Sequence, residues 1–139
     1  MAKTVRTVCI EKQQYLGVDS GKHSLVLSSQ DEENATGVSP SELLLLSLAA
    51  CTSYDVINIL TKKRQRLTGL EVTVTGEQDK DPPWTYRRMH IHYEVRGRGL
   101  REKAVEDAIE LTETKYCSVA VTLGATVELT YDYALIEDA

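Results

Sequence analysis

Cys51 and Cys117 are the residues whose type and context could support covalent redox chemistry in this chain. A thiolate attacks the O–O bond of a peroxide and becomes a sulfenic acid, which a second cysteine resolves as a disulfide. The alternative is that both side chains only pack, because free cysteine is among the most buried residue types. The residues alone leave both interpretations open. Cys9, in a strand-like segment, is expected to be a packed or edge residue.

Cys51 lies midway along a long helix predicted over 39–63. Ser39 is placed to cap this helix and Pro40 occupies its first position, where the missing N–H costs nothing. Glu42 completes a capping box with Ser39. The capping box explains Glu42 without any catalytic role.

The first half of this helix, residues 43–50, is apolar on every side. A helix that is hydrophobic all round is buried all round. A single chain of 139 residues has few layers in which to bury such a helix, so either its other elements wrap the helix or a second copy does. We predict a homodimer with this helix in the interface.

Alternating apolar and polar residues predict short strands. One such run, over 89–96, places Met89, Ile91, Tyr93 and Val95 on one face and charged or histidine side chains on the other. We expect it to form an antiparallel pair with the strand before it, with one face in water. The full set of expected strands is 4–10, 14–18, 24–28, 70–75, 89–96 and 127–133.

Two further helices are expected between the last two strands. An amphipathic helix over 100–115 has its apolar stripe on one side, formed by Leu100, Ala104, Ala108 and Leu111 with Val105 and Ile109 beside it. A short helical segment follows over 116–123. The chain is therefore predicted to be one domain, residues 1–139, of the α+β class with a mainly antiparallel sheet.

Composition excludes several classes of function. The chain is 42% hydrophobic, which supports a core, and its formal net charge of −5 argues against a nucleic-acid partner. Its first residues contain no apolar segment of a signal peptide. No run approaches the roughly 18 apolar residues of a membrane span. We expect a cytoplasmic protein without a membrane partner, in which three cysteines are too few for a disulfide framework.

A metal site and a cofactor are not expected from the sequence. His90, His92 and Glu94 share one strand face, and this spacing can present metal ligands. A polar face in contact with water explains the same three residues. The prediction is therefore no metal and no cofactor.

The contexts of the two cysteines resemble one known family. The sequence Ser39-Pro40-Ser41-Glu42-Leu43 leads to Ala49-Ala50-Cys51, and Lys115-Tyr116-Cys117-Ser118 follows much later. These patterns are similar to those of the OsmC/Ohr family of thiol peroxidases, in particular its YhfA-like branch, and the resemblance spans nearly the whole chain. It implies an intertwined α+β homodimer with buried central helices and two active sites at the interface.

The resemblance also implies an activity and its partners. Cys51 would be the peroxidatic thiol and Cys117 the resolving one. The substrates would be small hydrophobic hydroperoxides, reduced at the expense of a dithiol as part of oxidative-stress defence. The resemblance therefore implies a thiol peroxidase similar to the organic hydroperoxide reductases. The activity of this chain itself is a hypothesis.

The chain departs from the family at one mechanistic position. Active members pair an arginine of the N-terminal strands with a glutamate ten residues before the first cysteine, and the arginine stabilises the thiolate. Here Ser41 stands ten residues before Cys51, and no arginine lies between Arg6 and Arg64. We take His23, in a turn of the N-terminal strands, as the candidate cation that replaces it.

Asp55 is a second feature that opposes ionisation of Cys51. It follows Cys51 by one helical turn, and its carboxylate would disfavour a neighbouring thiolate. A second function is therefore kept open. The chain would be a catalytically weak family member that binds a small hydrophobic ligand, or senses redox state, in the dimer cleft.

Overall fold

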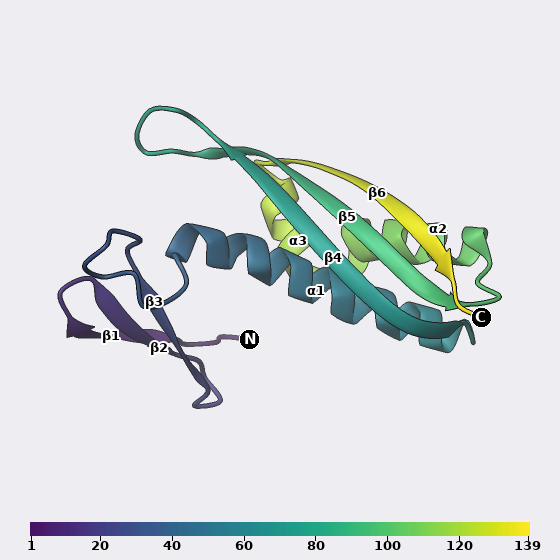
Figure 1. Cartoon of the computed structure of the whole chain (residues 1–139), viewed down its shortest axis with the longest axis horizontal. Helices are drawn as coiled ribbons and strands as arrows, with labels where there is room; N and C mark the ends of the chain where they lie inside the picture. Colours follow the sequence, from purple (N-terminus) through teal and green to yellow (C-terminus); the bar gives the residue numbers. More distant parts are fainter. The chain divides into compact units, whose positions relative to one another are not determined.

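The structure is a computed structural model that describes residues 1–139. The chain divides into two compact units, residues 1–44 and residues 45–139. Each unit contains its own three-stranded sheet (Figure 1). The order of elements and their α+β class agree with the prediction from sequence.

The sheet of the first unit is an antiparallel meander in the order β1-β2-β3. Its strands are β1 (Arg6–Glu11), β2 (Gln14–Val18) and β3 (Ser24–Ser28). The turn between β2 and β3 is closed by Asp19, whose Oδ1 accepts hydrogen bonds from the backbone N–H of His23 at 2.8 Å. An aspartate that bonds its own turn in this way favours a tight reversal. The predicted strand pairs are confirmed.

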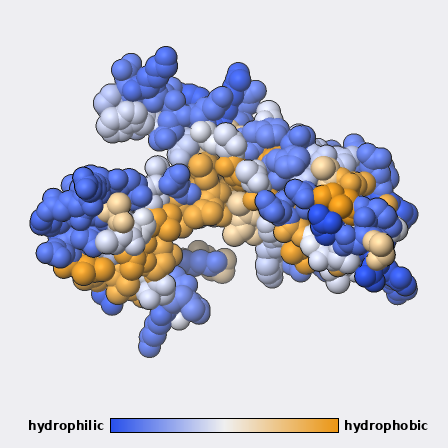
Figure 2. Space-filling view, viewed as in Figure 1, coloured by the Kyte–Doolittle hydropathy of each residue, from blue (hydrophilic) through white to orange (hydrophobic).

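The first unit buries polar side chains and leaves its large apolar ones uncovered. The buried polar residues of this unit are Ser28, Asn34 and Ser39. The apolar side chains left exposed include Val5, Val8, Ile10, Leu25 and Val26. Figure 2 shows this apolar surface in orange on the N-terminal strands. A single layer of sheet has no opposing layer against which to bury a face, so this unit has no apolar core of its own.

Helix α1 (Pro40–Lys62) begins as the sequence predicts. The Ser39 hydroxyl accepts a hydrogen bond from the backbone N–H of Glu42 at 3.2 Å and donates one to its carboxylate at 3.1 Å. These bonds satisfy a backbone donor that the first turn of a helix leaves unpaired. Glu42 is thus held at the helix start.

The second sheet has the order β4-β5-β6. Strand β4 (Arg66–Gln78) pairs antiparallel with β5 (Tyr86–Arg98), as predicted, and β6 (Glu128–Glu137) pairs parallel with β5. A parallel neighbour requires a crossover connection, which the helices between β5 and β6 supply. The inward-facing residues of β5 predicted from the alternation are all fully buried: Met89, Ile91, Tyr93 and Val95.

The crossover contains three helical segments. They are α2 (Glu102–Leu111), a single π-helical turn (Thr112–Tyr116), and α3 (Ser118–Gly124). The predicted helix over 100–115 is therefore too long at its start. Four of the residues predicted for its apolar side are buried, whereas two differ from the prediction. Leu111 is exposed and Leu100 precedes the helix.

The buried stripe of α2 consists of Ala104, Val105, Ala108 and Ile109, and Thr112 continues it. At about 100° per residue, Val105 and Thr112 lie near the middle of this stripe and Leu111 lies at its edge. The apolar pattern of the sequence predicts that Leu111 is buried. In the folded structure Thr112 is buried instead and Leu111 is exposed.

The core of the second unit lies between its sheet and its helices (Figure 1). It joins Leu48, Val56 and Leu60 of α1 to the buried face of β5 and to α2. Only one stripe of α1 is buried in the single chain, at i, i+4 spacing, whereas Leu46 is 53% exposed and Ile57 is 41% exposed. Of the two alternatives for this helix, complete wrapping by other elements of the same chain is therefore not observed.

Helix α1 is also long and apolar enough to span a membrane by length and composition, so the statement that no run approaches this length is corrected. The core helix of a water-soluble protein satisfies the same criterion. Here the stripe that contains Thr52 packs on the sheet. This packing accounts for the apolar character of that stripe.

Candidate redox site

The second unit brings Cys51 and Cys117 together. Their sulfur atoms and one carboxylate oxygen of Asp55 all lie within 4.8 Å of one another. Both cysteines are free thiols. The S–S bond of a disulfide is about 2.04 Å long, so a change of side-chain conformation is needed to close a bridge between these two sulfurs.

Helix α1 positions Cys51 and Asp55 on the same side, because residues four apart on a helix lie one above the other. Cys51 is beside the buried stripe of the helix and is half-buried, as is Asp55. Thr52, next in the chain, is fully buried. The two cysteines therefore lie at the margin of the core, with Cys51 partly exposed and Cys117 enclosed.

Cys117 is the N-cap residue of α3 and is fully buried. The π-helical turn before it ends in a hydrogen bond from the Cys117 backbone N–H to the carbonyl of Thr112 at 2.8 Å. Its sulfur accepts a hydrogen bond from the Ala120 N–H at 3.3 Å. These two bonds fix the thiol at the start of the short helix and direct it into the unit.

The electrostatics distinguish the two thiols. Burial raises the pKa of Cys117 to about 12, with a further contribution from its hydrogen bond to Cys51, although the backbone N–H groups of Ala120 and Val119 act in the opposite direction. Cys117 therefore remains protonated at neutral pH and can donate toward the other sulfur. Cys51 is the more exposed of the two thiols.

A buried polar pair that sequence reasoning missed lies next to the thiols. Tyr93 donates a hydrogen bond from its hydroxyl to Glu113 at 3.0 Å, and Thr52 is a second hydrogen-bonding partner of Tyr93. Burial raises the pKa of Glu113 to about 7, and the Tyr93 hydroxyl opposes this shift. Burial and the charge of Glu113 also raise the pKa of Tyr93.

The alternation of β5 placed Tyr93 in the core, so its burial was predictable from the sequence. No sequence signal marks Glu113, because one glutamate among the charges of an amphipathic helix is ordinary. The π-helical turn that carries Glu113 is also not predictable, although such turns are frequent at functional sites.

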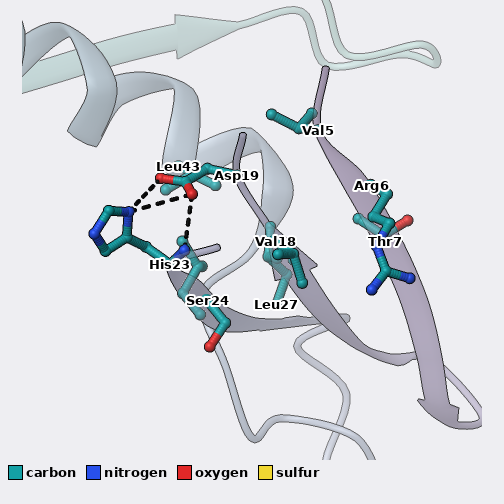
Figure 3. A pocket seen from close by; sticks show the side chains of 11 residues that line it. Val5, Arg6, Thr7, Val18, Asp19, His23, Ser24, Leu27 and Leu43 are labelled. Carbon is teal, nitrogen blue, oxygen red and sulfur yellow. Dashed lines mark hydrogen bonds and ion pairs between the residues drawn. The ribbon is translucent and has the colours of Figure 1, made fainter. Parts of the chain in front are cut away.

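His23 belongs to the first unit, where it is exposed and pairs with Asp19 at 3.0 Å. The backbone N–H of His23 and its side chain lower the pKa of Asp19. Figure 3 shows His23 held by Asp19 beside an apolar cavity of about 270 Å³. Its role with Cys51 remains a prediction.

Arg6 also lines this cavity, on β1 and well apart from His23 in Figure 3. From the sequence, no arginine was found between Arg6 and Arg64, and no role was assigned to Arg6 itself, which lies in the strand expected over 4–10. The structure places it at the first residue of β1, opposite Val18. The first unit therefore offers two basic side chains around one apolar cavity, of which the argument from sequence considered only His23.

On the outer face of the second sheet, the two other histidines do not form a group with Glu94, which was the set that the spacing along the strand suggested. His90 Nε2 and His92 Nδ1 each lie 2.8 Å from the same Asp132 oxygen of β6. Glu94 instead approaches Arg96, at 3.8 Å. The third member of this polar group is thus supplied by the parallel strand, a partner that spacing along β5 could not identify.

Comparisons with known proteins agree with the fold and with the sequence patterns around the cysteines. The family described as OsmC-like protein matches residues 31–132. Protein YhfA of Escherichia coli K12 is 32% identical over 131 residues, which cover 94% of this chain and 96% of YhfA. A crystal structure of a hypothetical protein from Aquifex aeolicus has a TM-score of 0.89 at 27% identity, covering 100% of this chain and 99% of that one.

A more distant structure has the same fold. It is the organic hydroperoxide resistance protein OsmC of Legionella pneumophila, with a TM-score of 0.69 at 11% identity, covering 96% of this chain and 97% of the other. The family match covers most of the chain, and the likeness to YhfA extends over almost all of it. This chain belongs to the OsmC-like family.

Proposed function

We propose that this protein is a thiol-dependent hydroperoxide reductase that uses Cys51 and Cys117 as its redox pair. The observation that carries the proposal is the approach of the two sulfurs, within 4.8 Å, with Cys51 half-buried and Cys117 fully buried. A peroxidatic thiol needs access to its substrate, and a resolving thiol needs only to reach the first sulfur. The two environments fit these two roles.

The reaction proceeds in three steps. The Cys51 thiolate attacks the terminal oxygen of ROOH, the O–O bond breaks, and the alkoxide leaves and takes up a proton as ROH. Cys51 is now a sulfenic acid. The Cys117 sulfur attacks the Cys51 sulfur, the S–O bond breaks, and the hydroxyl leaves as water with the Cys117 proton. An external dithiol supplies two electrons and two protons and restores both thiols.

The substrate class follows from the surroundings and from the family. Apolar side chains dominate α1 beside Cys51, and a protein of the same fold carries the name organic hydroperoxide resistance protein. We therefore assign small hydrophobic hydroperoxides as substrates, in oxidative-stress defence in the cytoplasm. His23 supplies the positive charge that Cys51 needs, in place of the arginine that the family uses.

The active form is proposed to be a homodimer. Leu46 and Ile57 of α1 are exposed in the single chain, and the first sheet has no core of its own. Exposed apolar surface of this kind is typical of an interface. A second copy of the chain covers both surfaces in the arrangement that the family resemblance implies.

A second function is supported by two observations. The Asp55 carboxylate lies beside the thiols, where it disfavours a thiolate. The first unit carries an apolar cavity of about 270 Å³, with Leu27 and Leu43 among its lining residues. These features favour a catalytically weak protein that binds a small hydrophobic ligand or senses redox state.

Stopped-flow oxidation of the reduced protein separates the two functions. A peroxidase is oxidised faster by cumene hydroperoxide than by hydrogen peroxide, and mass spectrometry then finds a Cys51–Cys117 bridge without any linkage to Cys9. The Cys9→Ser variant is the matched control and should behave as wild type. Equal, slow oxidation by both peroxides would favour the binding function.

A further inference from the structure

We propose that Cys51, Asp55 and Cys117, in the reduced protein, form a site for one thiophilic divalent cation, Zn²⁺ being the principal candidate. The proposal concerns the same residues as the proposed peroxidase, but it does not require that activity. The candidate ligands are two thiolate sulfurs and one carboxylate oxygen.

The three ligand atoms already lie within 4.8 Å of one another. Zinc binds sulfur at about 2.3 Å and carboxylate oxygen at about 2.0–2.2 Å, so tetrahedral coordination places two sulfurs about 3.8 Å apart. Side-chain rotation is sufficient to reach this spacing. Two thiolates and a carboxylate are all accepted zinc ligands, and a site with three protein ligands keeps its fourth position open for water.

The elements that carry the ligands are well suited to hold a metal ion. Cys51 and Asp55 are one turn apart on α1, a helix of 23 residues. Cys117 is fixed at the N-cap of α3 by the Ala120 N–H. Ligands on regular elements, with one of them buried and two half-buried, leave one side of the site open to solvent.

The carboxylate of Asp55 favours a divalent cation at this site. Its carboxylate makes no ion pair with a lysine, arginine or histidine of the same chain within 4.0 Å. Beside two thiols it opposes formation of a thiolate, but it attracts a divalent cation, whose own charge stabilises the thiolates. The feature that is unfavourable for peroxide chemistry is therefore favourable for metal binding.

Metal binding and oxidation exclude each other. Coordination requires both thiols to be deprotonated, and their two protons are released to the buffer. A Cys51–Cys117 disulfide has no thiolate left to donate. Zinc at this site therefore keeps the pair reduced and blocks Cys51, and oxidation of the pair releases the metal.

Co²⁺ is a direct probe, because thiolate ligands give sulfur-to-cobalt charge-transfer absorption and tetrahedral sites give intense visible bands. The reduced, chelator-treated protein is titrated with Co²⁺ under anaerobic conditions, and Zn²⁺ is then added as a competitor. One equivalent should bind and Zn²⁺ should displace it. Asp55→Asn, which keeps the shape of the side chain, should weaken binding at least about tenfold, the effect of losing a group that supports a metal.

Three variants make this measurement specific. Cys51→Ser should lose the two-thiolate spectrum. Cys9→Ser and His92→Asn remove the other accessible thiol and a histidine of the outer sheet face, and neither should change the titration. An undiminished charge-transfer band in Cys51→Ser, a band that depends on Cys9, or an unchanged Co²⁺ affinity in Asp55→Asn would overturn the proposal.

A second readout separates this proposal from the peroxidase. Oxidation by cumene hydroperoxide is followed with a chelator present and with one equivalent of Zn²⁺. Zinc should suppress formation of the Cys51–Cys117 bridge. If Co²⁺ binds as described but the metal-free protein does not react, only the peroxidase is rejected. If the bridge forms equally fast with zinc, only the metal site is rejected.

Discussion

The two units of this chain bury different kinds of side chain. The second unit has a continuous apolar core between one sheet and its helices, with Ile91 and Leu60 among its fully buried members. The first unit buries Ser28 and Asn34 and leaves apolar side chains such as Ile10 exposed. The second unit is therefore stabilised by its own apolar core, whereas the first is a single sheet layer that requires a covering surface.

The same division applies to the chemistry. The second unit holds two thiols and a carboxylate at one site, without a cation paired to that carboxylate. The first unit holds Arg6 and His23 around an apolar cavity. The proposed peroxidase uses residues of both units, and the following experiments test whether the reactivity of Cys51 depends on the first unit.

The largest effect is expected from the thiols of the second unit. Cys51→Ser should reduce hydroperoxide turnover to the uncatalysed background, because no sulfur remains to attack the O–O bond. Cys117→Ser should still be oxidised once but should not turn over, because the sulfenic acid is not resolved. Single-turnover and steady-state assays distinguish the two variants. Full turnover by Cys51→Ser would show that Cys51 is not the thiol that attacks the peroxide.

The next effect concerns the exposed surface of α1. Leu46→Glu should dissociate the proposed dimer, because an unpaired charge buried in an interface costs about 3 kcal/mol or more. Sedimentation velocity at micromolar concentration measures the change. Leu111→Glu is the control, since Leu111 is an exposed leucine of another helix, α2. A wild-type protein that sediments as a stable folded monomer would contradict the prediction.

A smaller effect is expected at the buried polar pair. Burial raises the pKa of Glu113 to about 7, well above the usual range of a glutamate carboxyl, which is about 4.3. The unfolded chain therefore ionises before the folded protein does, and folding stability falls as pH rises from about 4.5 to about 7, then stays lowered above that range. Because the carboxyl is half-buried, solvent screening reduces the expected loss to about 1–2 kcal/mol.

Glu113→Gln removes this pH dependence, so the difference in stability between variant and wild type should grow in favour of the variant between pH 5 and pH 8. Urea denaturation at both pH values measures it. Glu110→Gln, at an exposed position of the same helical region, should show no such trend. An equal difference at both pH values would mean that Glu113 does not titrate in this range.

The smallest effect concerns the cations of the first unit. If His23 stabilises the Cys51 thiolate, its replacement by alanine should lower the rate of alkylation by iodoacetamide about fivefold or less, which is what an exposed charge interaction of ~1 kcal/mol supplies. The profile from pH 5 to pH 10 should be bell-shaped in wild type and rise monotonically in His23→Ala. Arg6→Ala tests the second cation. Identical monotonic profiles in all three proteins would separate the first unit from the activation of Cys51.

Much of the fold could be predicted because it depends on local signals. The capping box at Ser39 and Glu42 defined the start of α1, and the period-two pattern of β5 identified its buried face, including Tyr93. Backbone conformation and side-chain alternation are set by near neighbours in the chain. The apolar run of α1 also indicated a helix that one copy of the chain does not enclose.

Other features were decided only by the tertiary structure, because they join residues that lie far apart in the sequence. The parallel pairing of β5 with β6 depends on the crossover, and it brings Asp132 to His90. The buried position of Glu113 depends on the π-helical turn and on Tyr93.

The sequence by itself determined the candidate thiols and the position of Asp55 one turn after Cys51, because helical spacing is local. The distance between Cys51 and Cys117, and the burial that keeps Cys117 protonated, were decided by the packing of α1 against the crossover helices. Desolvation depends on every group that surrounds an atom, and those groups come from all parts of the unit. For this reason the identity of the thiols was readable from the sequence, whereas the difference in burial between them required the structure.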